Sequence, residues 1–410
     1  MVNKFFRAIM PILTIGIMAC SNDDEAEAPE VPQKNKTVLF YVESDMNLWY
    51  MLDESLNEIE AGWEDGTDGN LIVYLDKSPY LTQFPSPVLL KIRHDETDRI
   101  VSEVIKHYPE QDSGDPEVVR RVLSEVIELF PAKTHGLAFA AHGNGWIPGN
   151  ARELINGDTG NHEHKTRHLA GPERYGSSLE IDELARILPI KYEFILFHAC
   201  MMANVETAYA LKDKCDYLIG TSQGLPGPGL PYAEVVPYLF TSPHADWYKF
   251  LRTSLNCYDE MERYQQPLTL SLIQTNLLDE LAEKTRKVMT SLAGDLPKFY
   301  RNLSDKVYHY EGDGAFSDLR QIIELQCDDP DNPSEEIAAF FDAINRAVPL
   351  KGATEKHWAD KEEMLLSPED FCGLSCYVPQ QNSRLDRFQE YYRTHYKWAE
   401  ASGFDLLIAK

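Results

Sequence analysis

The chain alternates short runs of apolar residues with stretches in which apolar residues recur at helical spacing. The runs are rich in Val, Ile, Leu and Phe, as strands are when both faces of a sheet are covered. Helical stretches separate the runs, and this order predicts a mostly parallel sheet with helices on both of its faces. The predicted strands of the first part of the chain are 38–42, 71–75, 88–92, 135–141 and 194–197.

Helices are predicted between these strands, at 48–59, 116–130 and 181–188. In sheets of this kind, ligand sites gather at the carboxyl ends of the strands. We therefore expect the functional residues of this chain where its strands end, rather than on its helices.

The first residues have the pattern of a secretion signal. A positively charged start precedes an apolar stretch at 9–19 that is too short to cross a bilayer as a stable helix. It ends in IMAC, residues 17–20, which resembles a bacterial lipobox. We expect residues 1–19 to be removed and Cys20 to carry a lipid that anchors the protein at the outer membrane or cell surface. A plain signal peptide with a chance cysteine is the alternative.

Acidic residues follow the lipobox. Residues 20–35 hold too little apolar surface to fold, and we expect them to form a solvated tether. The acidic run at 21–25 also resembles the surface-export signals of Bacteroidetes lipoproteins. The chain as a whole has a net charge of −27. So negative a surface repels phosphate backbones, and we expect no nucleic-acid partner.

The residues after the tether are enough for one large domain with an appended region. We expect an α/β domain at 36–245 and an α+β extension at 246–410 that packs on it. The extension has predicted strands at 268–273 and 371–378 and a predicted helix at 277–292.

A long polar segment separates two of the predicted strands. Residues 149–177 show no apolar period and are predicted to form an exposed loop. The loop contains His162, His164 and His168, which could bind a metal ion. Because the loop offers no fixed frame, adventitious binding or none is the favoured interpretation, and no metal site is predicted.

The seven cysteines are too few for a disulfide scaffold, and their spacing matches no zinc site. Cys372 and Cys376 lie in one predicted strand, which would separate them by about 13 Å, too far for a disulfide bond. We expect both to be core thiols and Cys215 to be structural as well.

One cysteine and one histidine follow neighbouring predicted strands. Cys200 is expected to begin the helix after strand 194–197, where the helix N-terminus would favour its thiolate form. His142 follows strand 135–141, and Gly143 can offer its backbone N–H without a side chain in the way. A thiol nucleophile needs such a base and such donors. Taken alone, a core cysteine and a capped turn are the simpler explanations.

Three segments in a fixed order resemble the clostripain family of cysteine peptidases. They are LAFAAHGNGW at 137–146, FILFHACMMANVETAYAL at 194–211 and LIGTSQGLPGPGLPY at 218–232. In addition, FCGLSCYVPQ at 371–380 resembles the late strand of the family. The resemblance extends over nearly all of the chain after the tether. It implies the caspase-like α/β/α sandwich that the family shares with gingipains, legumain and caspases.

The resemblance also implies the roles of the catalytic residues. His142 is then the base, Cys200 the nucleophile, and the backbone N–H groups of Gly143 and Cys200 form the oxyanion hole. Peptides or proteins are the implied substrates. No cofactor is implied, although some members of the family depend on calcium.

Four further residues are implied to bind substrate: Ser222, Gln223, His198 and Pro228. Here the chain departs from the family, which usually has an acid at the position of His198 and often another at that of Pro228. Those acids accompany a preference for Arg or Lys before the cleaved bond. Without them a buried cation lacks its counter-charge, which is costly, and we expect a non-basic preference. His198 could alternatively be a second base instead of a pocket wall.

A second function remains open. A peptidase fold that no longer cleaves could serve as a surface binding protein, and the substitutions at His198 and Pro228 favour that alternative. The intact pair of His142 and Cys200 argues against it, because a binding module has no chemical need for the pair.

Overall fold

The computed structural model describes residues 33–43, 49–76, 83–157, 179–260, 267–303, 306–310, 315–354 and 371–408, with the backbone alone for 49–53. Gln33–Lys410 forms one compact unit. The predicted signal at 1–19, the lipidated Cys20, and the three histidines of the loop lie outside the described residues. Residues 34 and 35 were expected to belong to the tether, but they are already part of the first strand.

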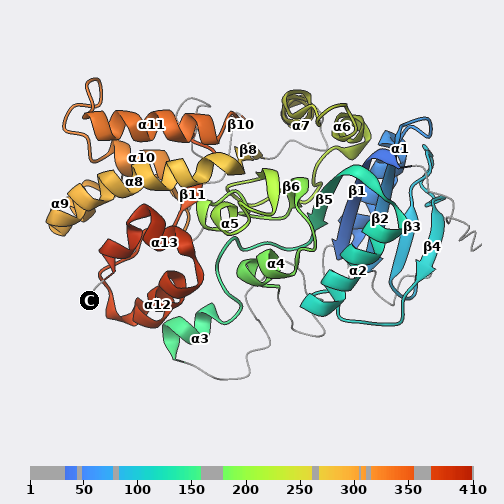
Figure 1. The fold of residues 1–410 in the computed structure, drawn as a ribbon, viewed down its shortest axis with the longest axis horizontal. Helices are drawn as coiled ribbons and strands as arrows, with labels where there is room; N and C mark the ends of the chain where they lie inside the picture. Colours follow the sequence, from blue (N-terminus) through green and yellow to red (C-terminus); the bar gives the residue numbers. More distant parts are fainter. Residues whose placement is uncertain are drawn as a thin grey trace, which may run out of the picture. The chain divides into compact units, whose positions relative to one another are not determined.

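A nine-stranded sheet lies at the centre of the described part of the chain, in the order β10-β8-β7-β6-β5-β1-β2-β3-β4 (Figure 1). The five strands from β7 to β2 are parallel neighbours, whereas β3 and β8 run against their neighbours on both sides. The predicted mostly parallel sheet is therefore confirmed. Its strands are β1 (Lys34–Glu43), β2 (Gly69–Asp76), β3 (Val88–Lys91), β4 (Glu103–His107), β5 (Ala132–Ala140), β6 (Tyr192–His198), β7 (Cys215–Gly220), β8 (Thr269–Gln274) and β10 (Leu350–Ala353).

Helices cover both faces of the sheet, as predicted. One face packs against α1 (Trp49–Gly62), α6 (Tyr232–Leu239) and α7 (Trp247–Glu260). The opposite face packs against α2 (Pro116–Leu129), α4 (Ile181–Ile187), α5 (Val205–Ala210), α8 (Leu278–Leu292) and α11 (Glu335–Ala347). Alternate residues of β1 enter the two cores: Phe40 lies in one and Tyr41 in the other. A strand buried on both faces needs a continuous apolar run, which is why the sequence revealed it.

The region after residue 245 shares this sheet, because β8 and β10 extend it beyond β7. The predicted strand 268–273 and helix 277–292 correspond to β8 and α8. The division at residue 245 stays a prediction. The other elements are α3 (Ala151–Asn156), α9 (Leu296–Leu303), β9 (Ser317–Asp318), α10 (Leu319–Glu324), β11 (Ser375–Cys376), α12 (Asp386–His395) and α13 (Lys397–Ser402).

Two predicted elements are wrong in the parts that the structure describes. The run 371–378 is buried throughout, but only Ser375 and Cys376 form a strand, which pairs with β9. A short apolar run signals burial and does not by itself distinguish a strand from a segment that crosses the core. The predicted loop 149–177 begins with a helix, α3, which packs on α12 and whose Glu153 carbonyl accepts from the Arg387 guanidinium at 2.9 Å.

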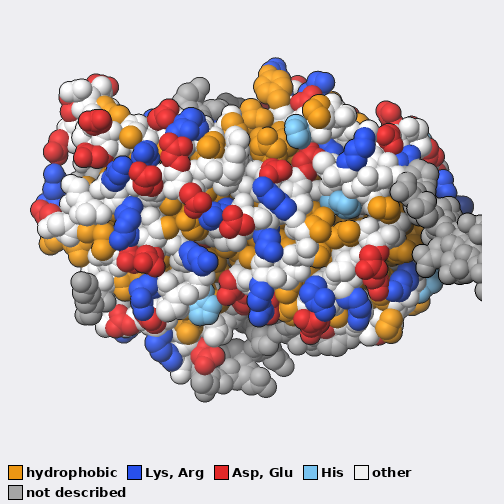
Figure 2. Space-filling model, in the orientation of Figure 1, with side chains coloured by type: hydrophobic (Ala, Val, Ile, Leu, Met, Phe, Trp, Pro, Cys, Tyr) orange, Lys and Arg blue, Asp and Glu red, His pale blue; other side chains and the backbone are white. Residues whose placement is uncertain are grey.

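The six described cysteines are free, and Cys215, Cys372 and Cys376 are buried. The prediction of core thiols is confirmed for these three. In the described ranges, no helix is both long and apolar enough to span a membrane. On the face drawn in Figure 2, acidic and basic side chains are interspersed.

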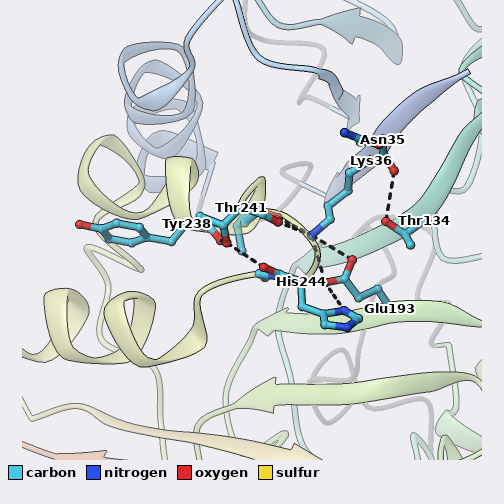
Figure 3. A network of polar contacts seen from close by, with 9 residues as sticks. Asn35, Lys36, Thr134, Glu193, Tyr238, Thr241 and His244 are labelled. Atoms are coloured by element: carbon cyan, nitrogen blue, oxygen red, sulfur yellow. Dashed lines mark hydrogen bonds and ion pairs between the residues drawn. The ribbon is translucent and has the colours of Figure 1, made fainter. Parts of the chain in front are cut away.

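A buried ion pair ties strands β1 and β6 together at the sheet edge where both begin (Figure 3). Lys36 Nζ lies 2.9 Å from Glu193 Oε2, and both side chains are at most 4% exposed. The ammonium group also donates to the carbonyls of Leu239 and Thr241, at 3.0 and 3.4 Å. Burial lowers the pKa of Lys36, and the Glu193 carboxylate acts in the opposite direction. The pair therefore fastens the segment after α6 to the sheet.

Replacing Lys36 by Met should lower the free energy of unfolding by about 3 kcal/mol, because it leaves the Glu193 carboxylate buried without a counter-charge. Lys34→Met is the matched control: its pair with Asp68 is 3.6 Å long and exposed, so a change below about 0.5 kcal/mol is expected. Adding Glu193→Met to Lys36→Met should restore most of the loss. Urea unfolding measures all three variants, and equal losses for the two lysines would contradict this account.

Candidate active site

The register of two neighbouring strands brings the predicted catalytic residues to one edge of the sheet. Strands β5 and β6 are parallel, with Ala140 opposite His198. The Ala141 N–H continues the pairing and donates to the His198 carbonyl at 3.3 Å. His142 and Cys200 each follow the paired residues by two positions, so both leave the sheet at its carboxyl edge, where sites in parallel sheets form.

Gly143 lies directly against the backbone of Cys200. A Cβ atom at Gly143 would be 2.5 Å from the Cys200 carbonyl oxygen and 2.9 Å from the Cys200 nitrogen. Any larger residue would push the two backbones apart. The two N–H groups that the sequence suggested for the oxyanion hole thus come from backbones in close contact.

The predicted helix position of Cys200 is wrong. The residue lies in a turn, and α5 begins only at Val205. Asn204 caps this helix, since its Oδ1 accepts from the Thr207 N–H at 2.8 Å. Asn is among the best N-cap residues, and this signal in the sequence would have placed the helix correctly. The helix N-terminus is therefore not at the thiol, and the predicted stabilisation of a thiolate by this helix loses its basis.

The turn after β6 is strained at Met201, which has a φ of 58°. A left-handed backbone costs a residue with a side chain about 1 kcal/mol. Two hydrogen bonds hold the turn in this form: Asn204 Nδ2 donates to the Met201 carbonyl at 2.7 Å, and the Met201 N–H donates to the Gln223 carbonyl at 2.8 Å. Strain maintained in this way is common where a reactive side chain must be presented.

A segment after β7 runs beside this turn and reaches the thiol. The Ala203 N–H donates to the Thr221 carbonyl at 2.9 Å, and with the bond from Met201 to Gln223 this shows that the two segments run antiparallel. The Leu225 N–H then donates to Cys200 Sγ at 3.3 Å. No pattern in the sequence pointed to Leu225, because the contact is made by its backbone.

Ser222 and Gln223, which were predicted to bind substrate, lie in the same segment with side chains that are 0% exposed. Ser222 Oγ donates to the carbonyls of Ala203 and Gly373, at 3.2 and 3.3 Å. The Ser222 side chain thus holds the turn that carries Cys200, whereas Gln223 holds it through its backbone carbonyl. Their contact with substrate stays a prediction.

His198 lies beneath the loop that contains Pro228. A Cβ atom at Gly229 would be 2.3 Å from His198 Cε1, so the loop covers the imidazole closely. His198 Nδ1 is 2.8 Å from the Tyr232 hydroxyl. Burial lowers the pKa of His198 to about 4, so the ring is neutral near pH 7. Pro228 is partly exposed beside it. A neutral imidazole supplies no charge to attract a basic side chain.

The C-terminal helices support the loop that follows β5. Trp146 is fully buried, and its ring lies 4.9 to 5.6 Å from the rings of four residues. The Tyr396 hydroxyl also donates to the Trp146 carbonyl at 2.8 Å. The loop that carries His142 and Gly143 is thus packed against the end of the chain, a link that the sequence did not reveal. The four aromatic residues are Tyr377, Phe388, Tyr392 and Tyr396.

Among the described residues, no group of three or more His, Cys, Asp or Glu side chains is placed to hold a metal ion.

Comparisons with known proteins identify the family of the chain. The profile of the clostripain family of C11 peptidases matches residues 40–409. Clostripain of Hathewaya histolytica is 26% identical over 229 residues, which are 49% of this chain and 42% of that protein. The chain thus spans less than half the length of this curated relative.

Two solved structures are similar over 91% of this chain. One is a secreted C11 cysteine protease of Bacteroides thetaiotaomicron in complex with an irreversible peptide inhibitor; it is 27% identical, with a TM-score of 0.70 and all of that chain covered. The other is an inactive zymogen of a C11 protease from Parabacteroides distasonis; it is 25% identical, with a TM-score of 0.71 and 99% of that chain covered. With the caspase-like sheet and the family match over most of its length, the chain belongs to the clostripain family of C11 peptidases.

Proposed function

We propose that this chain is a cysteine endopeptidase with Cys200 as its nucleophile and His142 as its base. The observation that carries the proposal is the β5–β6 register, which sends both residues to one edge of the sheet. The contact between Gly143 and the Cys200 backbone supports it. Membership of the clostripain family makes peptides or proteins the expected substrates.

In the proposed reaction, His142 takes the proton of the Cys200 thiol, and the thiolate attacks the carbonyl carbon of the substrate. A C–S bond forms while the carbonyl electron pair moves to oxygen, which accepts hydrogen bonds from the N–H groups of Gly143 and Cys200. His142 then gives its proton to the leaving amine as the C–N bond breaks. Water, deprotonated by His142, attacks the acyl-enzyme in the same way and releases Cys200.

The side chain before the cleaved bond is proposed to be non-basic. His198 stands where the family usually has an acid, and its buried ring is neutral. A guanidinium or ammonium group beside it would lose water and gain no counter-charge. Small, apolar or acidic residues are therefore expected before the cleaved bond of good substrates.

The protein is also proposed to be exported and anchored through a lipid on Cys20. The support is the resemblance of residues 17–20 to a lipobox, together with the description of a similar C11 protease as secreted. The charge of −27 favours peptide substrates over nucleic acid.

Cys200→Ala and His142→Ala should each lower peptide hydrolysis by roughly a thousandfold or more, because the two residues act as one unit. Cys327→Ala and His395→Ala are matched controls outside the site and should keep nearly full activity. A mixed peptide library provides the substrates. Because a similar protein is described as an inactive zymogen, both intact protein and protein nicked within 158–178 are assayed. Activity of either site variant within tenfold of wild type would refute the assignment. An inactive wild type that still binds peptides would favour the binding-protein alternative.

Turnover is compared for matched peptides that have Arg or Ala before the cleaved bond. His198→Asp should raise the ratio of Arg-peptide to Ala-peptide turnover by tenfold or more, because a buried carboxylate pairs well with a guanidinium group. His198→Asn is the neutral control. In the wild type the ratio should stay constant from pH 8 to pH 5, since His198 with a pKa of about 4 remains uncharged over that range. A strong wild-type preference for Arg would show that another acid, such as Glu234, serves the pocket.

Cys20→Ala should move the protein from the membrane fraction to the soluble fraction, with peptide hydrolysis retained, because Cys20 precedes the compact unit. Mass spectrometry of the wild type should find a lipid on Cys20. An unmodified Met1 in the mature protein would exclude lipid anchoring.

A further inference from the structure

The thiol of Cys200 lies against the backbone of Leu225 on the neighbouring segment. The Leu225 N–H donates to Cys200 Sγ at 3.3 Å, and the thiol donates to the Leu225 carbonyl at 3.9 Å, a longer and weaker contact. Cys200 as a residue is partly exposed.

Several contacts fix this distance. The segments 201–203 and 221–223 run antiparallel. The N–H groups of Met201 and Ala203 donate to the carbonyls of Gln223 and Thr221, and these bonds join the segments next to the contact between Leu225 and Cys200. Thr221 Oγ1 accepts from the Gln223 N–H at 3.2 Å, which tightens the bend toward Leu225. The Leu225 side chain packs against the core on the α1, α6 and α7 face. The donor is thus held by both backbone and side chain.

A fixed N–H donor favours the thiolate over the thiol, because a hydrogen bond to an anion is stronger than one to a neutral sulfur. In this fold the helix N-terminus is too far along the chain to fill that role, since α5 begins at Val205. We propose that the Leu225 backbone N–H stabilises the thiolate of Cys200 before it attacks. This inference rests on the proposed function, in which Cys200 is the nucleophile.

The contribution should depend on pH in a way that a purely structural role does not. The bond stabilises the thiolate and weakens once the sulfur becomes part of a neutral thioester. Loss of the Leu225 hydrogen bond should slow the reaction at pH values at which the Cys200 thiol is protonated. It should have little effect at higher pH, at which the thiolate is already formed. His142 leaves the end of β5 at the same edge of the sheet as Cys200, and burial keeps His198, two residues before Cys200, neutral.

Leu225→Pro removes the donor, and Leu225→Ala removes only the side chain. Among the described contacts, this N–H bonds only to Cys200 Sγ. Leu225 already precedes Pro226, and Gly224 before it tolerates a following proline. Both variants are made in the His142→Ala background, so that the measured titration belongs to Cys200 alone.

The readout is the rate of alkylation of Cys200 by iodoacetamide against pH, with Cys200→Ser to subtract the other cysteines. Leu225→Pro should move the midpoint upward by about one pH unit relative to Leu225→Ala, equivalent to about tenfold less thiolate below the midpoint. Equal midpoints in the two variants would overturn the proposal.

A second measurement does not depend on the proline variant folding. In ¹⁵N-leucine-labelled protein, the Leu225 amide resonance is identified as the one missing from Leu225→Ala. It should shift with the alkylation midpoint of Cys200 and stay constant in Cys200→Ser. A Leu225 amide resonance that does not shift as Cys200 titrates, in protein that retains both residues, would also overturn the proposal. Hydrolysis that survives Cys200→Ala would instead refute the proposed nucleophile, and the two failures are thereby distinguished.

Discussion

The parallel pairing of β5 with β6 is the constraint on which the proposed site depends. It sets Ala140 opposite His198 and so releases His142 and Cys200 from the same edge of the sheet. A shift by one residue would turn each strand's side chains to the opposite face. That shift is resisted by two cores, because Phe139 and Phe197 are buried on one face and Ala138 and Leu196 on the other. The hydrophobic cores thereby fix the register of the strands that lead to the proposed catalytic residues.

Around this register, segments far apart in the sequence hold the two turns in place. The segment 221–225 bonds to the turn that carries Cys200, and Asn204 caps both that turn and α5. Trp146 joins the loop after β5 to the C-terminal helices through an aromatic cluster. The region after residue 245 supplies strands to the sheet as well as packing to the site. Truncation of the region after residue 245 would therefore be expected to disturb both the sheet and the site.

The sequence predicted the sheet well because strands buried on both faces require apolar runs that few other elements show. It also predicted which residues leave the carboxyl edge, since His142 and Cys200 follow such runs directly. It failed where backbone geometry decides the outcome. The turn at Cys200–Met201 and the contact at Leu225 depend on backbone N–H and carbonyl groups, which almost any residue can supply. The buried run at 371–378 shows the same limit, because burial was predicted correctly and strand pairing was not.

The most direct test of the central claim is to locate the covalent adduct left by an irreversible peptide inhibitor with Ala next to its reactive group. The account predicts one adduct per chain, found by peptide mapping on Cys200, and much slower labelling in His142→Ala, where no base takes the thiol proton. An adduct on Cys257 or Cys327 with Cys200 left unmodified, in active protein, would contradict the account.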